Sequence, residues 1–174
     1  MARRRVADIL VALGSNIEPE RRLAQAARLL KAAFPQVRFS HCYRNAAVGF
    51  DGQDFINAAA RFDSDAGLPR LLEVLHGIEA QCGRRRDDPQ WAPRAMDLDV
   101  LLIDALVGEW PGLKLPRADL LRRAYMLGPA SELAPALRHP TDGRSLSELW
   151  HALRPRAPAL TPVALDLNEM EPDP

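Results

Sequence analysis

The chain has 174 residues, of which 47% are hydrophobic, and its 23 basic side chains balance 23 acidic ones. This length and composition predict one globular domain with a substantial core and exclude a disordered chain. The zero formal charge gives no electrostatic reason to expect nucleic acid or an anionic membrane as a partner.

Two cysteines, Cys42 and Cys82, lie far apart and form no Cys-x-x-Cys motif. We expect buried thiols in a reducing compartment, with a disulfide between them as the alternative. The basic start, MARRRVADILVAL, contains an apolar run too short to span a membrane, and the polar GSN ends it without a small-residue cleavage site. We therefore expect a basic tail before a first strand, and a cytoplasmic protein.

The first half of the chain alternates strand and helix patterns. Residues 7–13, which are apolar apart from Asp8, predict a strand. Residues 15–34 predict a helix with Ser15 or Asn16 as its cap. The spacing of apolar residues and the positions of turn-forming residues predict the following elements: a strand at 37–46, a loop at 47–54, a strand at 55–64 and a helix at 68–83.

The second half contains one long loop and one strongly apolar strand. Residues 84–94, RRRDDPQWAPR, are rich in charge and proline and show no regular spacing of apolar residues, which predicts a loop. Loops of this length in compact domains are often functional. Residues 96–104, MDLDVLLID, predict a strand. The remaining expected elements are a short helical piece after Pro116, a short helix within 125–135 and a capped helix at 141–153.

Mixed strands and helices with hairpin-like neighbours predict an α+β fold. We expect residues 1–154 to form a single domain. Residues 155–174 are rich in proline and end in acidic residues. We expect this tail to be mostly disordered, or to pack as a poorly regular extension.

Asp97 and Asp99 stand at the beginning of the apolar strand. On a helix, residues two apart point in nearly opposite directions, whereas on a strand they share a face roughly 7 Å apart. A cation between them would stabilise two such charges, and carboxylate oxygens suit Mg²⁺, which is usually bound together with substrate phosphates. The alternative is the solvent-facing edge of an amphipathic strand.

Arginines are concentrated in the loop that leads into this strand: Arg84, Arg85, Arg86 and Arg94. Guanidinium groups beside a metal-binding acid pair are typical of phosphoryl transfer, because they stabilise the charge in transit. The alternative is a solvated loop in which the arginines pair with the neighbouring aspartates. Trp91 in the same loop is either a hydrophobic anchor or a cover for a bound base.

Other motifs of catalysis and nucleotide binding are missing from the sequence. There is no G-x-x-x-x-G-K-[ST] motif, so a bound nucleotide would not be held by a P-loop. The four histidines form no H-E-x-x-H or similar zinc-binding group. The absence of G-x-S-x-G argues against an α/β-hydrolase.

The segment PRAMDLDVLL, preceded by GRRR and W, resembles the signature of the 6-hydroxymethyl-7,8-dihydropterin pyrophosphokinase family. Four further blocks occur in the order of that family: VALGSN, YRNAAVG with DFINAA, IEAQCGR, and LPRADLLRRAYMLGPASELAP. The resemblance covers roughly residues 7–145. It implies a ferredoxin-like, mostly antiparallel sheet flanked by helices, in three α-β-α layers.

The resemblance also implies an enzyme of folate biosynthesis that transfers pyrophosphate from ATP to the pterin and releases AMP. Asp97 and Asp99 would bind two Mg²⁺ ions, and Arg84 and Arg94 would be catalytic. The nucleotide side would contain Glu79, Arg86, Trp91, Val100, Arg117 and Arg123. The pterin would lie between Phe55 and Tyr125, with Asn57 at its edge and the loop backbone at Asn45, Ala46 and Val48 around it. We expect a monomer with no nucleic-acid or membrane partner.

The chain departs from the family pattern at several positions. Arg117 and Ala118 stand where the family usually has His-Tyr in contact with the ATP phosphates, so only the arginine could keep such a contact. Further departures are Asn45-Ala46-Ala47 in place of Thr-Pro-Pro, a connection from Gly49 to Phe55 that is one residue short, Gln90 for a basic residue and Ala92 for glycine. One alternative function is therefore a paralogue that binds a pterin or a nucleotide but transfers poorly. Another is a metal-dependent phosphotransferase or nuclease with a different substrate.

Overall fold

The structure is a computed structural model that describes residues 5–47, 52–85, 87, 89 and 93–174. The main sheet of this part of the chain contains the strands β1 (Ala7–Ser15), β2 (Arg38–Phe39), β3 (Cys42–Asn45), β4 (Phe55–Ser64), β5 (Asp97–Ile103) and β8 (Thr161–Val163). Their order is β5-β1-β4-β3-β8, with β2 paired to β4, and these pairings are antiparallel.

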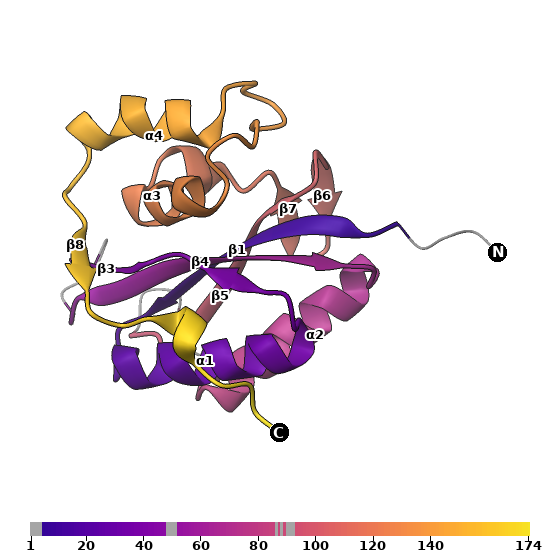
Figure 1. Cartoon of the computed structure of the whole chain (residues 1–174), viewed down its shortest axis with the longest axis vertical. Coiled ribbons are helices and arrows are strands. Elements are labelled where there is room, and N and C mark those ends of the chain that lie inside the picture. The colour runs from indigo at the N-terminus through magenta and orange to yellow at the C-terminus, as the bar shows by residue number, and fades with distance from the viewer. Residues whose placement is uncertain (1–4, 48–51, 86, 88, 90–92) are drawn as a thin grey trace.

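Helices cover both faces of this sheet (Figure 1). The helices α1 (Pro19–Ala33) and α2 (Leu68–Gln81) lie on one face, and α3 (Ala124–Leu133) and α4 (Leu146–Leu153) lie on the other. The 3-10 turns are η1 (Ala118–Leu121), η2 (Arg154–Arg156) and η3 (Leu167–Glu169). The predicted α+β fold, with an antiparallel sheet between helices, is confirmed. Within the described residues, no helix combines the length and the hydropathy that a membrane span requires.

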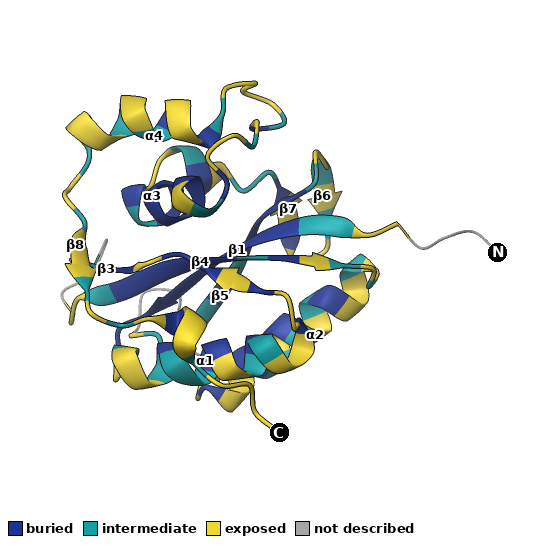
Figure 2. Ribbon diagram, viewed as in Figure 1, coloured by how far each residue is buried: buried dark blue, intermediate teal, exposed yellow. Residues whose placement is uncertain are grey.

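Strand β1 is buried on both of its faces (Figure 2). Because side chains alternate along a strand, Ile9 and Val11 pack in the core shared with α1 and α2, whereas Leu10 and Ala12 pack in the core shared with α3 and α4. A strand that is covered on both sides has a continuous apolar sequence. This explains why residues 9–13 form one continuous apolar run.

Residues 37–46 form two short strands where one was predicted. Ser40 lies between β2 and β3, where its hydroxyl accepts the N–H of Ala59 at 2.8 Å and its own N–H donates to the Ala59 carbonyl at 2.9 Å. A serine side chain that bonds a backbone group competes with the regular ladder. The prediction of extended backbone is therefore right, but the strand is interrupted.

Helix α1 is not capped by Ser15 or Asn16, so that prediction is wrong. Its N-cap residue is Glu18, and no side chain caps the helix. Asn16 is buried and joins two other segments, because its side-chain amide donates to the Gln53 carbonyl at 3.2 Å and accepts the N–H of Arg94 at 2.6 Å. The polar side chain is used to hold two loops together and is not available to the helix.

A short hairpin that the sequence did not reveal follows β5. It consists of β6 (Gly108–Trp110) and β7 (Leu113–Leu115), which pair with each other. Strands of three residues are too short for a readable alternation of apolar and polar side chains. The turn between them contains Gly112 with a positive φ of 75°, which glycine adopts without steric cost.

The C-terminal residues 155–174 are ordered, so the expectation of a mostly disordered tail is wrong. Strand β8 pairs with β3, and Leu167 is fully buried. Asn168 accepts the N–H of Phe39 and donates to the Phe39 carbonyl, both at 2.9 Å. The alternative expectation, a poorly regular extension that packs on the domain, describes this segment, because its few apolar and amide side chains find partners in the sheet and in α1.

Candidate active site

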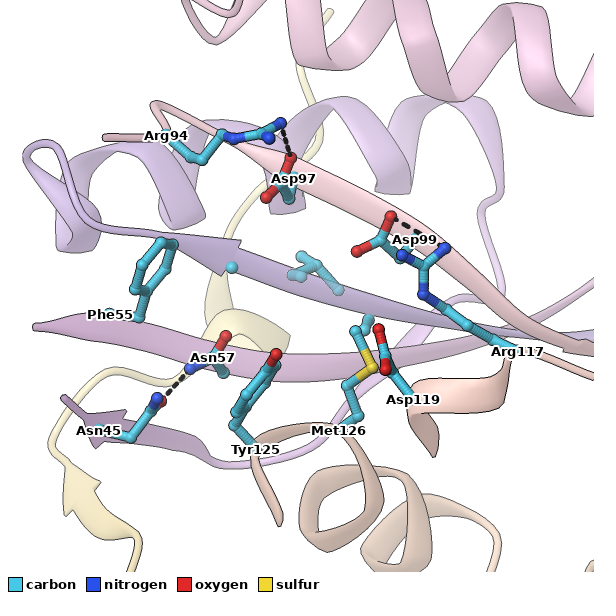
Figure 3. Close-up of a pocket in the computed structure, with 13 residues that line it drawn as sticks. Asn45, Phe55, Asn57, Arg94, Asp97, Asp99, Arg117, Asp119, Tyr125 and Met126 are labelled. Carbon is cyan, nitrogen blue, oxygen red and sulfur yellow. Dashed lines mark hydrogen bonds and ion pairs between the residues drawn. The ribbon is translucent and has the colours of Figure 1, made fainter. Parts of the chain in front are cut away.

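A pocket of about 210 Å³ opens on the face of the sheet that α3 and α4 cover (Figure 3). Several segments contribute to its lining, from β1, β3, β4 and β5 to the beginning of α3. The predicted site residues that line it are Asn45, Phe55, Asn57, Arg94, Asp97, Asp99, Arg117 and Tyr125. The structure thus brings together residues that are up to 80 positions apart in the sequence, from Asn45 to Tyr125.

The two aspartates lie on one face of β5, as the strand interpretation requires. Leu98 and Val100 alternate with them and are buried in the core beneath the sheet, next to α1 and α2. Asp97 and Asp99 therefore face the pocket on the opposite side. The apolar character of the strand and the two charges are compatible because they belong to different faces.

Asp97 is bound by both arginines that the sequence singled out as catalytic. Its Oδ1 lies 2.6 Å from Nη1 of Arg84 and 3.3 Å from Nη1 of Arg94. Arg84 also donates to the carboxylate of Glu79, which is only 5% exposed at the end of α2. Burial raises the pKa of Glu79 to about 7, although the charge of Arg84 acts in the other direction.

Asp99 is paired with Arg117, whose Nη1 lies 3.5 Å from Oδ1 of the aspartate. Burial raises the pKa of Asp99; the guanidinium of Arg117 opposes this rise and the nearby charge of Asp97 adds to it. The Nε of Arg117 is buried, and no described residue offers it a hydrogen-bond partner. Arg117 therefore has donor capacity left over beside the pocket.

The acid pair has the donors that Mg²⁺ prefers, since both side chains present carboxylate oxygens to the pocket. In the part of the chain that the structure describes, no group of three or more His, Cys, Asp or Glu side chains could hold a metal. The protein would thus supply part of the coordination shell. This fits Mg²⁺, which keeps several waters and takes phosphate oxygens of a substrate as further ligands.

Two aromatic side chains, Phe55 from β4 and Tyr125 from α3, line the pocket, and Asn57 lies between them in the view of Figure 3. Burial raises the pKa of Tyr125, so its phenol stays protonated near neutral pH. The pocket therefore combines two aromatic rings with one amide. This combination suits a flat ligand with hydrogen-bonding groups at its edge.

A second hollow of about 610 Å³ lies along α2. Its lining includes His76, Glu79, Arg84 and Arg85. Arg84 also contacts Asp97, which lines the first pocket. The side chain of Arg84 therefore connects the two hollows.

Other predicted site residues lie elsewhere or cannot be placed. Val100 is 3% exposed, packs in the core and lines neither hollow. Arg123 is exposed and is the N-cap residue of α3. Ala46 is exposed, and its carbonyl accepts a hydrogen bond from Asn45. The positions outside the described residues are Val48, Arg86, Gln90, Trp91 and Ala92.

The pocket also contains residues that sequence reasoning missed: Ala12, Leu13, Gly14, Asp119 and Met126. Gly14 lies in the VALGSN block of the family resemblance, but no role was predicted for it. Met126 directly follows Tyr125, and Asp119 follows Arg117 by two positions. For Asp119 and Met126, closeness in sequence to predicted site residues was the signal that could have found them.

Comparison with known proteins connects this site to one family. Residues 10–135 match the family model described as 7,8-dihydro-6-hydroxymethylpterin-pyrophosphokinase. The 2-amino-4-hydroxy-6-hydroxymethyldihydropteridine pyrophosphokinase of Pseudomonas aeruginosa is 39% identical over 148 residues, which cover 83% of this chain and 90% of that protein. The protein of the same name from Bacillus subtilis is 35% identical over 127 residues, which cover 71% and 75% of the two chains.

Solved structures agree on the fold. The crystal structure of Plasmodium falciparum HPPK-DHPS with pteroate is similar with a TM-score of 0.69 at 10% identity, and the match covers 87% of this chain and 43% of that chain. This chain thus spans less than half of that longer protein, and at such identity the likeness concerns the fold alone. By the family model and by the identity to its relatives, the chain belongs to the 7,8-dihydro-6-hydroxymethylpterin-pyrophosphokinase family.

Proposed function

We propose that this protein transfers pyrophosphate from ATP to 6-hydroxymethyl-7,8-dihydropterin and releases AMP, a step of folate biosynthesis. The observation that carries the proposal is that Arg84 and Arg94 both donate hydrogen bonds to Asp97. This aspartate lines a pocket that also contains two aromatic rings. Membership of the family supports the same reaction.

The first pocket is our candidate for the pterin site. Phe55 and Tyr125 would stack on the two faces of the ring, since aromatic surfaces gain from such contacts. Asn57 would bond the ring edge, because an amide offers both a donor and an acceptor. The loop around Asn45, Ala46 and Val48 would complete the pocket.

The second hollow is our candidate for part of the nucleotide site, with Glu79 and Arg84 on its wall. Because Arg84 also contacts Asp97, the phosphates would lie between the two hollows. Arg117 would contact a phosphate oxygen, since its side chain lines the first pocket. We keep Arg86, Trp91, Val100 and Arg123 as further candidates on the nucleotide side.

In the proposed reaction the hydroxymethyl oxygen of the pterin bonds to the β-phosphorus of ATP and loses its proton, which is released to water. The bond from that phosphorus to the oxygen of the α-phosphate breaks, and AMP leaves with this oxygen. Asp97 and Asp99 would hold two Mg²⁺ ions, which would supply positive charge that offsets the charge of the phosphates. Arg84 and Arg94 would orient the phosphates and stabilise the charge that shifts toward AMP.

We further propose a monomer that acts in the cytoplasm, with residues 155–174 as a C-terminal extension of the catalytic domain. Cys42 and Cys82 are both buried and unpaired, which is the state expected in a reducing compartment. Size-exclusion chromatography with light scattering measures the oligomeric state. A stable dimer at micromolar concentration would contradict the monomer.

Incubation of the protein with ATP, Mg²⁺ and 6-hydroxymethyl-7,8-dihydropterin tests the reaction, with AMP quantified by chromatography. We expect AMP to form only when the pterin is present and in equal amount to the pyrophosphorylated product. No AMP above background at high protein concentration would overturn the proposal. Tight pterin binding without turnover would instead support the binding paralogue, in which Arg117 keeps Asp99 paired.

A further inference from the structure

Two asparagine side chains beside the pocket form a short chain of hydrogen bonds (Figure 3). Nδ2 of Asn45 donates to the carbonyl of Ala46 at 3.0 Å. Nδ2 of Asn57 in turn donates to Oδ1 of Asn45. Asn45 lies at the end of β3, and Asn57 lies on the neighbouring strand β4, two residues beyond the register partner of Asn45.

The direction of this chain follows from chemistry at its first link. A peptide carbonyl can only accept a hydrogen bond, so the amide atom of Asn45 that faces Ala46 must be the nitrogen. The other end of the Asn45 amide is then the oxygen, and the atom of Asn57 that faces it must also be a nitrogen. The orientation of both amides is therefore determined by one backbone oxygen.

The remaining atom of the Asn57 amide is its Oδ1, which is left as an unused acceptor. Asn57 is only 5% exposed and lines the pocket. Its hydrogen bond to Asn45 uses the nitrogen, and none of the described residues donates to its oxygen. Because Asn57 lines the pocket, a ligand that donates a hydrogen bond to this oxygen would be favoured.

Gly14 makes room for this oxygen on the floor of the pocket. It is the register partner of Asn57 on the adjacent strand β1. A Cβ at position 14 would lie 2.7 Å from Oδ1 of Asn57, which is closer than van der Waals contact allows. The bare backbone of Gly14 therefore permits the orientation of the amide that Asn45 selects.

We propose that Asn45 is a positioning residue that sets the polarity of the Asn57 amide, and that the pocket thereby selects flat heterocycles whose edge donates N–H groups. The identity of the ligand as a pterin rests on the proposed function; the polarity of the amide pair does not. A pterin has such donors in its 2-amino group and its ring N3–H. Asn45 itself acts through Asn57 and need not touch the ligand with its side chain.

Binding of three probes tests the selection: 6-hydroxymethylpterin, the lumazine analogue in which an oxo group replaces the 2-amino group, and the 2,4-diamino analogue, which lacks N3–H. Calorimetry in the presence of Mg²⁺ and a non-hydrolysable ATP analogue gives their dissociation constants. We expect the wild-type protein to bind at least one analogue roughly tenfold more weakly than the pterin, because the Asn57 acceptor then loses its donor. In Asn45→Ala the ratio of the dissociation constants of analogue and pterin should fall toward one, because the Asn57 amide can turn and donate with its Nδ2.

Asn45→Asp is the matched control variant. A carboxylate at position 45 still accepts from Nδ2 of Asn57, so the preference for the pterin should be retained even if all three probes bind more weakly. A merely structural role of Asn45 would weaken all three probes by the same factor in both variants. The proposal would be overturned if Asn45→Ala kept the wild-type ratio of dissociation constants. It would also be overturned if Asn45→Asp lost as much selectivity as Asn45→Ala.

A measurement on the free protein separates this inference from the proposed function. In NMR spectra, the side-chain NH₂ resonances of Asn57, assigned by their loss in Asn57→Asp, should show slow exchange of the proton that bonds Asn45. Asn45→Ala should abolish this protection and Asn45→Asp should keep it. If none of the probes binds the wild-type protein, the assignment of the ligand as a pterin fails. The spectra then test the orientation of the Asn57 amide by themselves. Protection of the Asn57 proton that persists in Asn45→Ala would refute the proposed role of Asn45.

Discussion

The guanidinium of Arg84 reaches from the end of α2 to β5, where its Nη1 lies 2.6 Å from Oδ1 of Asp97. Charges of both signs are balanced around this contact. The ionisable side chains of the described site that pair with one another are Glu79, Arg84, Arg94, Asp97, Asp99 and Arg117. Because carboxylates and guanidiniums offset each other here, the negative charge of a triphosphate calls for additional cations, which agrees with a Mg²⁺-dependent reaction.

Removing either charge of the acid pair should abolish most activity. We expect Asp97→Asn and Asp99→Asn to lower kcat by about a hundredfold or more, because loss of a group that stabilises transition-state charge has effects of this size. AMP formation at saturating substrates measures the effect, and calorimetry measures Mg²⁺ binding. Asp63→Asn, near the exposed end of β4, is the control and should keep normal turnover. Wild-type turnover in either site variant would show that the metal role is wrong.

Activity should require the planar guanidinium group of Arg84 and not only a positive charge at this position. Arg84→Lys keeps one positive charge but loses the planar group that contacts both Glu79 and Asp97. We expect kcat to fall by about a hundredfold, since arginines that stabilise a transferring phosphoryl group contribute effects of this order or larger. Arg144→Lys, in an exposed ion pair with Asp142, should be neutral. An equal effect of the two substitutions would argue against a role of Arg84 in transfer.

A methyl group at position 14 should disturb ligand binding through Asn57. In Gly14→Ala the new Cβ would meet Oδ1 of Asn57 at 2.7 Å, so the amide must move away from its place in the pocket. We expect the dissociation constant of 6-hydroxymethylpterin to rise roughly tenfold, as for loss of one buried hydrogen bond. Gly67→Ala is the control, because its Cβ meets Pro69 at an ordinary 3.9 Å. Equal affinities of the two variants would contradict the role of Gly14.

The buried side chain of His139 should make stability depend on pH. Its Nδ1 accepts N–H groups of Thr141 and Asp142, and burial lowers its pKa below 6.5, although the charge of Asp142 opposes this. The folded state therefore binds fewer protons than the unfolded state just below pH 6.5, so the free energy of unfolding falls as the pH drops through that value.

His139→Asn retains an acceptor in place of Nδ1 but cannot be protonated. Urea unfolding at about pH 7.5 and about pH 5.5 should therefore show a larger loss of stability in the wild-type protein than in this variant. Parallel losses in the two proteins would mean that His139 does not contribute to the acid sensitivity. Other groups titrate in both proteins, so the difference between them isolates the histidine.

The C-terminal extension should stabilise the sheet through Asn168. Its side chain bonds both the N–H and the carbonyl of Phe39, and Asn168→Ala would leave these two backbone groups without partners from the protein. We expect a loss of about 2 kcal/mol in the free energy of unfolding, measured by urea denaturation. Glu169→Ala changes the exposed neighbouring residue and should have little effect. A loss below that of the control would show that the extension is not coupled to the sheet.

The sequence was sufficient where a local pattern carries the information. Strand β4 spans the predicted residues 55–64, and α2 begins at the predicted Leu68, because periodicity and turn residues act over a few positions. The position of Asp97 and Asp99 on one face of a strand also follows from a local period of two. The long loop and its arginines could be selected from the sequence as candidates, but the partners of Arg84 and Arg94 could not be predicted from it.

By itself the sequence determined the fold class, the acid pair with its arginines and the family, since each depends on patterns within short segments and on the order of those segments along the chain. The tertiary structure alone decided that Asn16 joins two loops, that the C-terminal segment pairs with β3, and that Asn45 orients Asn57. These contacts connect segments that are distant in sequence, and each depends on which of several equivalent donors and acceptors come within hydrogen-bonding distance. Side-chain amides and hydroxyls have no periodic pattern of their own, so their partners are determined only when the sheet and helices are assembled.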